Sequence, residues 1–268
     1  MSAHAEELAR GERFGFGENW SRFLSVVDEA RIADAVTSLR DMLGVESLAG
    51  LTFLDAGSGS GLFSLAARRL GARVHSFDYD PQSVACTAEM RRRFAPGDEA
   101  WTVEEGSVLD EAYLERLGTF DVVYSWGVLH HTGAMWRAVG NVTRRVKAGG
   151  RLFIALYNDQ GFISRYWLHV KQLYVRVPLL RLPLIGVHMV YPFLPSLAYR
   201  AVTGRLHQRR GMSFWRDVVD WVGGLPFEVA SVEAVRAFCA ERGFSAQRVV
   251  PTRRHGCNEF VFVRNGAR

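Results

Sequence analysis

One stretch near residue 55 constrains the fold more than any other part of the chain. The apolar run 51–54 is typical of a buried strand, and it ends in Asp55 and three glycines (Gly57, Gly59 and Gly61). Glycine lets the backbone turn sharply and approach a ligand closely, and the helical pattern of 62–70 points free N–H groups into the same space. A dinucleotide-binding fold needs a further glycine where Leu62 stands. The stretch therefore predicts a nucleotide-binding strand, turn and helix, but not the dinucleotide type.

The pattern acid-x-Gly-x-Gly-x-Gly resembles the first motif of the class I S-adenosylmethionine-dependent methyltransferases, in which the glycine turn packs against the methionine part of the cofactor. The resemblance implies a second acid at the end of the next strand, which holds the two ribose hydroxyls. Asp78 stands at the end of the expected strand 73–78, about twenty residues beyond the first turn. A carboxylate suits a diol because it accepts two hydrogen bonds at once. Tyr79 follows, where an aromatic ring could cover the adenine face.

Two later strands continue the resemblance. Strand 100–104 leads into Ser107 and Val108, where the family contacts the adenine edge; the family often has an acid where Ser107 stands, so we expect the hydroxyl or backbone groups to recognise adenine. Strand 120–124 runs into Ser125 and a Leu-His-His motif that is also typical of the family. After a helical pattern, a turn at Gly149 and Gly150 is expected to lead to strand five at 151–156. The ordered set is far more specific than any single motif. It implies a cofactor site made of Asp55, Gly57, Ser58, Gly59, Gly61, Asp78, Tyr79, Ser107, Val108, Ser125 and Trp20.

Strands that alternate with helices predict an α/β fold with a parallel sheet, whose ligands lie beyond the carboxyl ends of the strands. The resemblance implies a seven-stranded Rossmann-like methyltransferase sheet, parallel with one antiparallel strand. We expect an N-terminal helical cap at 1–48, a catalytic core at 49–158 and 231–268, and a largely helical insertion after strand five at 159–230.

The N-terminal cap carries three aromatic residues ahead of a helical pattern that runs to about residue 43. In related methyltransferases an N-terminal helix covers the cofactor, so Phe14, Phe16 and Trp20 would close over it. The alternative is that they simply pack the cap onto the core.

The insertion is rich in apolar residues and proline between 173 and 202, but its arginines and prolines exclude a membrane span. Three interpretations stay open: a substrate lid, a dimer surface, or an amphipathic element on a membrane surface. We rank the lid first, because an insertion after strand five lies beside the mouth of the site. Its residues, among them the acceptor candidates Arg209, Arg210 and Glu228, either line the acceptor pocket or serve ordinary turns and packing. Asn158, at the end of strand five, is a further acceptor candidate.

Methyl transfer from a sulfonium requires alignment of the acceptor and, for a hydroxyl, removal of its proton. Histidine titrates near neutrality, so His130 and His131 are candidate bases, and His131 is favoured because in relatives the second position of the pair faces the acceptor. Tyr157 is a second candidate base. The alternative for either imidazole is a buried hydrogen bond without a catalytic role. Adjacent histidines without further ligands predict no metal site.

The composition limits which binding partners and which cellular compartment we expect. The net charge of +5 comes almost wholly from arginine, without a long basic stripe, which disfavours a nucleic-acid partner. Three cysteines without paired spacing and no apolar leader predict a cytoplasmic protein. We expect a monomer or homodimer with no transmembrane segment, for which peripheral membrane contact stays open.

The leading functional hypothesis is O-methylation of a small aromatic or hydrophobic metabolite, with S-adenosylmethionine as cofactor and S-adenosylhomocysteine as product. A tRNA methyltransferase acting on a wobble uridine is an alternative, which predicts a continuous basic surface around the pocket. A second alternative is a cofactor-binding partner protein without catalysis, which predicts binding without turnover.

Overall fold

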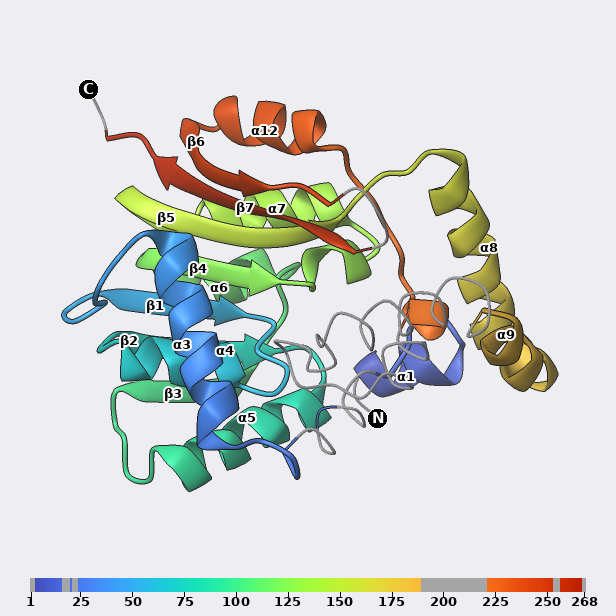
Figure 1. Ribbon diagram of the computed structural model, residues 1–268, viewed down its shortest axis with the longest axis horizontal. Coiled ribbons are helices and arrows are strands. Elements are labelled where there is room, and N and C mark those ends of the chain that lie inside the picture. The colour runs from blue at the N-terminus through green and yellow to red at the C-terminus, as the bar shows by residue number, and fades with distance from the viewer. Residues whose placement is uncertain (1–2, 16–19, 21–23, 189–220, 253–255, 267–268) are drawn as a thin grey trace, which may run out of the picture.

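A computed structural model describes residues 3–15, 20, 24–188, 221–252 and 256–266. At its centre lies one seven-stranded sheet in the order β3-β2-β1-β4-β5-β7-β6 (Figure 1). The strands are β1 Thr52–Ala56, β2 Arg73–Asp78, β3 Trp101–Glu105, β4 Phe120–Trp126, β5 Val146–Tyr157, β6 Phe244–Val250 and β7 Cys257–Arg264. Strands β1 to β5 pair in parallel, and β7 runs antiparallel to both β5 and β6. The predicted fold class and the single antiparallel strand are confirmed.

Helices cover both faces of the sheet. One face carries α3 Glu29–Leu43, α4 Leu62–Arg69 and α5 Pro81–Phe94, and the other carries α6 Glu111–Leu117, α7 Met135–Thr143 and α12 Val232–Ala240 (Figure 1). Strand β1 serves both layers, because Phe53 packs into the first cluster and its neighbour Leu54 into the second. This is the alternation that a strand buried on both faces requires.

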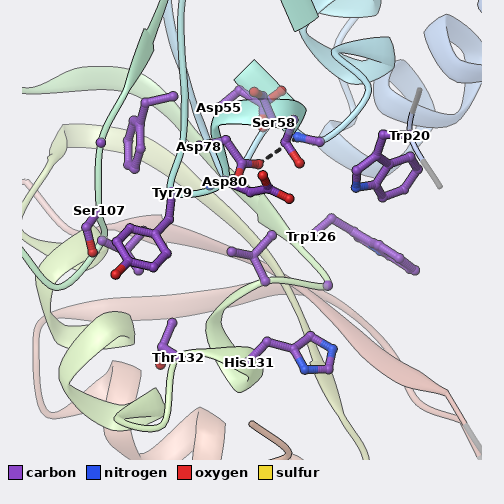
Figure 2. Close-up of a pocket in the computed structure, with 18 of the residues that line it drawn as sticks. Trp20, Asp55, Ser58, Asp78, Tyr79, Asp80, Ser107, Trp126, His131 and Thr132 are labelled. Atoms are coloured by element: carbon purple, nitrogen blue, oxygen red, sulfur yellow. Dashed lines mark hydrogen bonds between the residues drawn. The ribbon is translucent and has the colours of Figure 1, made fainter. Parts of the chain in front are cut away.

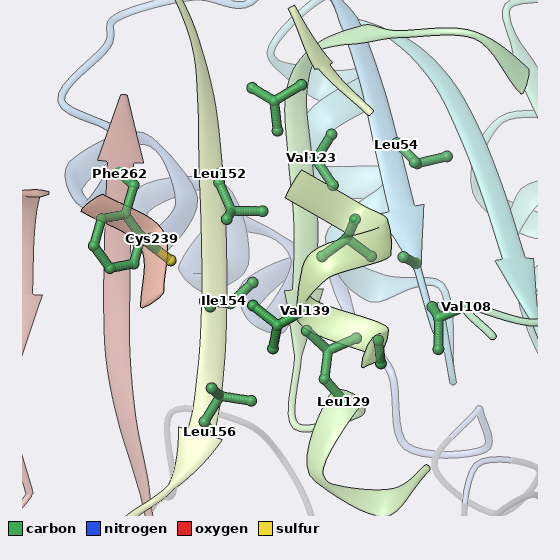
Figure 3. Packing of buried hydrophobic residues seen from close by; sticks show 14 of the residues in the cluster. Leu54, Val108, Val123, Leu129, Val139, Leu152, Ile154, Leu156, Cys239 and Phe262 are labelled. Carbon is green, nitrogen blue, oxygen red and sulfur yellow. The ribbon is translucent and has the colours of Figure 1, made fainter. Parts of the chain in front are cut away.

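The second layer is a continuous apolar cluster. Figure 3 shows Val139 and Leu129 packed against Val123 and Ile154 of the sheet, and Cys239 of α12 against Phe262. Val123, Leu129, Val139 and Ile154 are fully buried. The cluster fixes the end of β4, from which the histidine pair projects.

Strand β5 differs from its expected bounds. The sequence places Gly149 and Gly150 in a turn before the strand, but the strand begins at Val146 and runs through both glycines. Its pairing with β4 shifts between Phe120 and Val122, and a Cβ at Gly150 would lie 2.9 Å from the Asp121 carbonyl oxygen. The glycine pair therefore accommodates a bulge within the strand rather than a turn ahead of it.

The remaining helices lie beyond the carboxyl ends of the parallel strands (Figure 1). They are α1 Ala3–Ala9, the 3-10 turns η1 Leu129–His131 and η2 Pro178–Leu180, α8 Phe162–Arg176 and α9 Arg181–His188. The insertion after β5 is thus helical over its described part. No helix in the described ranges has the length and apolarity that a membrane crossing requires.

Candidate active site

A pocket of about 420 Å³ opens at the carboxyl ends of the strands, where the strand order reverses between β1 and β4. Its walls come from the turn after β1, the ends of β2, β3 and β4, and the N-terminal residues. Figure 2 shows Asp78 and Asp80 on one side of the pocket and His131 and Thr132 across from them. The pocket lies where the predicted strand ends were expected to converge.

The glycine turn forms one wall. The backbone N–H of Gly57 donates to the Phe77 carbonyl oxygen at 2.9 Å, which ties the turn to β2. Gly57 has a φ of +88°, and a Cβ there would lie 2.5 Å from the methyl groups of Val128. The indole of Trp20 lies so close to Gly59 that a Cβ on this glycine would meet it at 3.0 Å. The wall thus excludes side chains at two of its glycines, and Trp20 closes over it.

Asp78 joins the end of β2 to this turn. Its Oδ2 accepts a hydrogen bond from the N–H of Gly59 at 2.9 Å, and its Oδ1 accepts one from the N–H of Asp80 at 3.0 Å. Burial raises the pKa of Asp78 to about 6, although these hydrogen bonds oppose the rise. The carboxylate is therefore oriented by backbone groups and ionised at neutral pH.

Asp55 lies deeper, at the end of β1. Its Oδ2 accepts a hydrogen bond from the Ser64 hydroxyl, while its buried Oδ1 has no partner among the described residues. Burial raises the pKa of Asp55 to about 7, and the nearby charge of Asp78 adds to the rise. Asp55 and Asp78 together form the acidic end of the pocket. Burial of these two carboxyl groups destabilises the folded protein when no ligand is bound.

The N-terminal residues close the pocket over Tyr79. The Tyr79 hydroxyl donates to Glu7 at 3.3 Å, and the Arg13 guanidinium lies 5.0 Å from the centre of its ring. Arg13 also donates to Glu7 at 2.7 Å and to the His131 carbonyl oxygen at 2.9 Å. The ring of His4 meets Tyr79 edge-on at 5.5 Å. The tyrosine is thus held between the sheet and the N-terminal segment.

The histidine pair forms η1, directly after β4. The Nδ1 of His131 lies 2.6 Å from the Pro226 carbonyl oxygen; because a carbonyl only accepts, Nδ1 carries the proton and Nε2 the lone pair. Burial lowers the pKa of His131 to about 3, and the charges of Lys171 and Arg13 act in the same direction. His131 is therefore neutral and lines the pocket.

The other two candidate bases do not reach the pocket. His130 is fully buried, and its Nδ1 accepts a hydrogen bond from the Tyr157 N–H at 3.3 Å. Burial also lowers the pKa of His130 well below its ordinary value. The rings of His130 and Tyr157 are in contact, with centroids 3.8 Å apart and planes tilted by 34°, and neither residue lines the pocket. Of the two histidines, His131 lines the pocket and His130 does not.

Comparison with known proteins agrees with this geometry. Residues 54–152 match the model of the family described as "Methyltransferase domain". They are a class I S-adenosylmethionine-dependent methyltransferase domain. S-adenosylmethionine is the cofactor of this family.

The relatives agree on this domain and differ in what they act on. The ubiquinone biosynthesis O-methyltransferase of Methylobacterium sp. (strain 4-46) is 37% identical over 120 residues, which are 44% of this chain and 46% of that protein. The ribosomal protein L11 methyltransferase of Methylococcus capsulatus (strain ATCC 33009 / NCIMB 11132 / Bath) is 39% identical over 71 residues, 26% of this chain and 24% of that protein. The matched stretches span less than half the length of these curated relatives. Both relatives are methyltransferases by name, but the acceptors in their names differ.

A solved structure extends the likeness in fold to most of the chain. The magnesium protoporphyrin IX methyltransferase of Synechocystis PCC 6803, solved with bound SAH, matches with a TM-score of 0.56 over 92% of this chain and 94% of that one. The two chains are 16% identical, so the likeness is one of fold.

The fold brings most of the predicted cofactor residues together. Trp20, Asp55, Gly57, Ser58, Gly59, Asp78, Tyr79, Ser107 and Val108 all line the pocket. Gly61 and Ser125 stand behind the wall: Gly61 precedes the first turn of α4, and the Ser125 hydroxyl donates to the Ala56 carbonyl oxygen at 2.7 Å. These two support the turn instead of facing the pocket.

The two acceptor candidates among the described residues, Asn158 and Glu228, are held in other parts of the fold. Asn158 donates to the Thr252 carbonyl oxygen at 3.1 Å and accepts from Asn258 at 3.0 Å, which joins β5 to β7. The Glu228 carboxylate accepts from the N–H of Met135 at 3.0 Å, at the start of α7. Neither side chain lines the pocket. Arg209, Arg210 and Phe16 lie outside the described residues.

Several pocket residues had no signal in the sequence. His4, Glu7 and Arg13 come from a seven-residue helix and the segment after it, and Thr132 follows the histidine pair. A short helix with no apolar periodicity gives no motif, and its contacts with Tyr79 are tertiary. Only Asp80 could have been found, since a polar residue ahead of Pro81 is a helix-capping pattern; its side chain accepts from the Gln82 N–H at 2.9 Å.

The pocket fits a nucleoside that carries an amino acid. Its acidic end offers an unpaired Asp55 oxygen and the Asp78 carboxylate, and the glycine wall lets a ligand approach the backbone closely. No group of three or more metal-ligating side chains occurs in the described ranges. The donors present suit an organic ligand.

Proposed function

We propose that this chain transfers a methyl group from S-adenosylmethionine to an oxygen atom of a small aromatic or hydrophobic acceptor. One observation supports this most: a single pocket has two carboxylates and a glycine wall at one end and a neutral histidine at the other. The curated relatives named ubiquinone biosynthesis O-methyltransferase support an oxygen acceptor.

The acidic end is suited to the cofactor. Asp78 accepts backbone hydrogen bonds from Gly59 and Asp80, but a carboxylate has about four acceptor positions, so it can also accept from the ribose hydroxyls. Tyr79, held by Glu7 and Arg13, would cover the adenine face, and Ser107 and Val108, which line the same pocket, would meet the adenine edge. Gly57 to Gly59 would receive the methionine part, with Trp20 closed over them.

The other end is suited to an apolar acceptor. Phe14, Phe63, Trp126 and Val128 line the pocket together with His131. Aromatic and aliphatic walls bind a ring through buried apolar area, and one polar group fixes its orientation. That group is the Nε2 lone pair of His131, which would accept a hydrogen bond from the acceptor hydroxyl.

Bound S-adenosylmethionine supplies a methyl group on a positively charged sulfur, which is activated for transfer to a nucleophile. His131 contributes orientation and a destination for the proton. As the acceptor oxygen gains its bond to carbon, its proton becomes far more acidic than an imidazolium, so even a histidine whose pKa is about 3 can take it. The Pro226 carbonyl holds the ring throughout, because it keeps the proton on Nδ1.

Calorimetric titration with S-adenosylmethionine and S-adenosylhomocysteine tests the proposal. Micromolar binding to the wild type should weaken by about a hundredfold or more in Asp78→Ala, since charge-assisted hydrogen bonds to the ribose are lost. Glu105→Ala is the matched control, because Glu105 pairs with Asp78 in the neighbouring strand but is exposed and outside the pocket. Its affinity should equal that of the wild type.

Turnover is then measured with a panel of catechols, phenols and quinols. Methylation of any of these, lost in His131→Ala with the cofactor affinity retained, supports the whole proposal. Cofactor binding without turnover on any oxygen acceptor would overturn the acceptor class and favour the non-catalytic alternative. No cofactor binding would overturn the assignment itself.

A further inference from the structure

The insertion after β5 has an unusual charge pattern. Between Gln160 and Arg216 the sequence contains no aspartate or glutamate, although acids make up 28 of the 268 residues. The same stretch contains arginines throughout and is otherwise largely apolar. A soluble surface normally mixes both signs of charge, so this segment differs from the rest of the chain.

The described part of this segment exposes apolar side chains. On α8, Phe162, Tyr166 and Leu173 follow one another at helical spacing and are 74%, 45% and 45% exposed. The adjoining side of the helix is buried through Trp167 and Tyr174. The helix is thus apolar on both its inner and outer faces.

The outer surface continues past the end of α8. Leu179 of η2 is 90% exposed, and Leu182 and Val187 of α9 are 77% and 65% exposed. Arg165, Arg176 and Arg181 are exposed on the same elements. We call this set of apolar and basic side chains on α8, η2 and α9 the outer face; in Figure 1 these elements stand off from the sheet on one side of the molecule.

We propose that the outer face docks on an anionic lipid surface. Exposed leucine and phenylalanine side chains gain free energy when they enter the acyl boundary, and arginines beside them are attracted to anionic headgroups. Charge complementarity favours a lipid surface over the other possible binding partners. A second copy of the chain in a twofold contact would bring the same arginines against each other, and a nucleic acid would offer no apolar surface to Leu179 and Leu182.

Helix α8, which carries part of the outer face, also lies next to the pocket. Tyr174, on the inner side of α8, contacts the ring of Phe14 with centroids 6.4 Å apart, and Phe14 lines the pocket. A chain docked through α8 would therefore hold the pocket near the lipid surface. On the proposed function, this position lets an apolar acceptor reach His131 from the membrane.

Co-sedimentation with lipid vesicles tests the docking surface. Wild-type protein should bind vesicles of phosphatidylcholine with phosphatidylglycerol much more tightly than phosphatidylcholine alone, and high salt should weaken the binding. Leu179→Ser with Leu182→Ser should reduce the affinity about tenfold or more, and Arg165→Gln with Arg176→Gln should reduce it roughly fivefold for each arginine.

The matched control is Val26→Ser with Val250→Ser, which removes two apolar side chains that are 44% and 40% exposed on other elements. This variant should bind vesicles as the wild type does. Calorimetric binding of S-adenosylhomocysteine, together with the thermal transition, shows that each variant is folded. Vesicle docking and methyl transfer can fail separately, because the vesicle assay contains neither cofactor nor acceptor.

Three results would overturn the proposal. One is the absence of binding to anionic vesicles, and another is vesicle binding that neither outer-face variant changes. The third is a dimer at low concentration that Leu179→Ser with Leu182→Ser converts to monomer while vesicles are ignored, since the outer face would then be an interface between copies.

Discussion

The two ends of the pocket are built in different ways. The acidic end, which we propose for the cofactor and call the cofactor end, is assembled from neighbouring strands. The turn after β1 donates hydrogen bonds to the Phe77 carbonyl oxygen and to Asp78, both at the end of β2. The opposite end, which contains His131 and which we propose for the acceptor, is the acceptor end. It joins residues that are far apart in the chain: Arg13 donates to the His131 carbonyl oxygen, and the His131 ring donates to the Pro226 carbonyl oxygen. A local motif can encode the first end, but only tertiary packing produces the second.

The two ends also differ in the charge that burial suppresses. Burial raises the pKa of Asp55 to about 7 and of Asp78 to about 6, but it lowers the pKa of His131 to about 3. The same physical cause acts in opposite directions, because the charged form is anionic in one case and cationic in the other. The carboxyl groups of Asp55 and Asp78 therefore ionise near neutral pH, whereas His131 stays neutral.

The largest expected effect comes from filling the glycine wall. In Gly57→Ala the new Cβ would lie 2.5 Å from Val128 and the φ of +88° would be strained, so we expect a loss of about 3 kcal/mol in the free energy of unfolding and no measurable cofactor binding. Gly127→Ala is the matched control: its φ is +73°, but nothing lies within 4 Å, so only about 1 kcal/mol of strain applies.

Urea denaturation and calorimetry measure both quantities. Adding Val128→Ala to Gly57→Ala should restore part of the stability, because it removes the two methyl groups that clash. Equal losses in Gly57→Ala and Gly127→Ala would show that the wall is not closely packed at Gly57.

A second prediction concerns Asp55 and stability. Its pKa of about 7 in the folded protein lies above its ordinary value of 3.8, so the folded state holds the proton more tightly than the unfolded state. The unliganded protein therefore loses stability as pH rises from about 4 to 7. Asp55→Asn should remove this loss and raise the free energy of unfolding at pH 8 by a few kcal/mol, with little change near pH 4.

Asp121→Asn provides the opposite case. Burial pushes the pKa of Asp121 up, but hydrogen bonds from Lys147 and Thr52 outweigh it and leave the pKa below its ordinary value. This substitution should destabilise the fold at pH 8. Thermal transitions of both variants at pH 4 and pH 8 make the comparison; a destabilised Asp55→Asn at pH 8 would contradict the sign.

The sequence was sufficient for the sheet and for the cofactor end, for a physical reason. Strand ends and glycine turns leave a local pattern, so Asp55 and Gly57 could be placed from the residues, and Asp78 from the second acid that the resemblance implies. The pair at 149–150 shows the limit, because glycines serve a bulge as well as a turn.

The acceptor end could not be obtained in this way. Arg13 and Pro226 meet His131 through contacts across the fold, which leave no periodic trace in the sequence. The choice of His131 over His130 came from the resemblance to relatives, not from the residues. Alternation of neighbouring side chains applies to strands, whereas the pair forms a 3-10 turn.

A third prediction sharpens the contrast between the two ends by activity. His131→Ala should lower turnover about a hundredfold while the affinity for S-adenosylhomocysteine stays near that of the wild type. Because the pKa of His131 is about 3, turnover should not fall through protonation of this histidine above about pH 4, whereas cofactor affinity should weaken below pH 7 as Asp55 and Asp78 take up protons.

Rates and binding constants between pH 5 and 9 separate the two effects. His169→Ala is the control, since His169 is exposed on α8 and outside the pocket. Full activity in His131→Ala would remove this residue from the mechanism.

The smallest expected effect distinguishes a structural carboxylate from an acceptor-binding one. Glu228 was predicted to line the acceptor pocket, but its carboxylate accepts hydrogen bonds from the Met135 N–H at 3.1 and 3.0 Å and so caps α7. Glu228→Ala should cost about 1 kcal/mol of unfolding free energy, as the loss of a helix cap does, and Glu228→Gln less, because one acceptor oxygen remains. The KM for the acceptor should not change in either variant; a raised KM with unchanged stability would return Glu228 to the acceptor site.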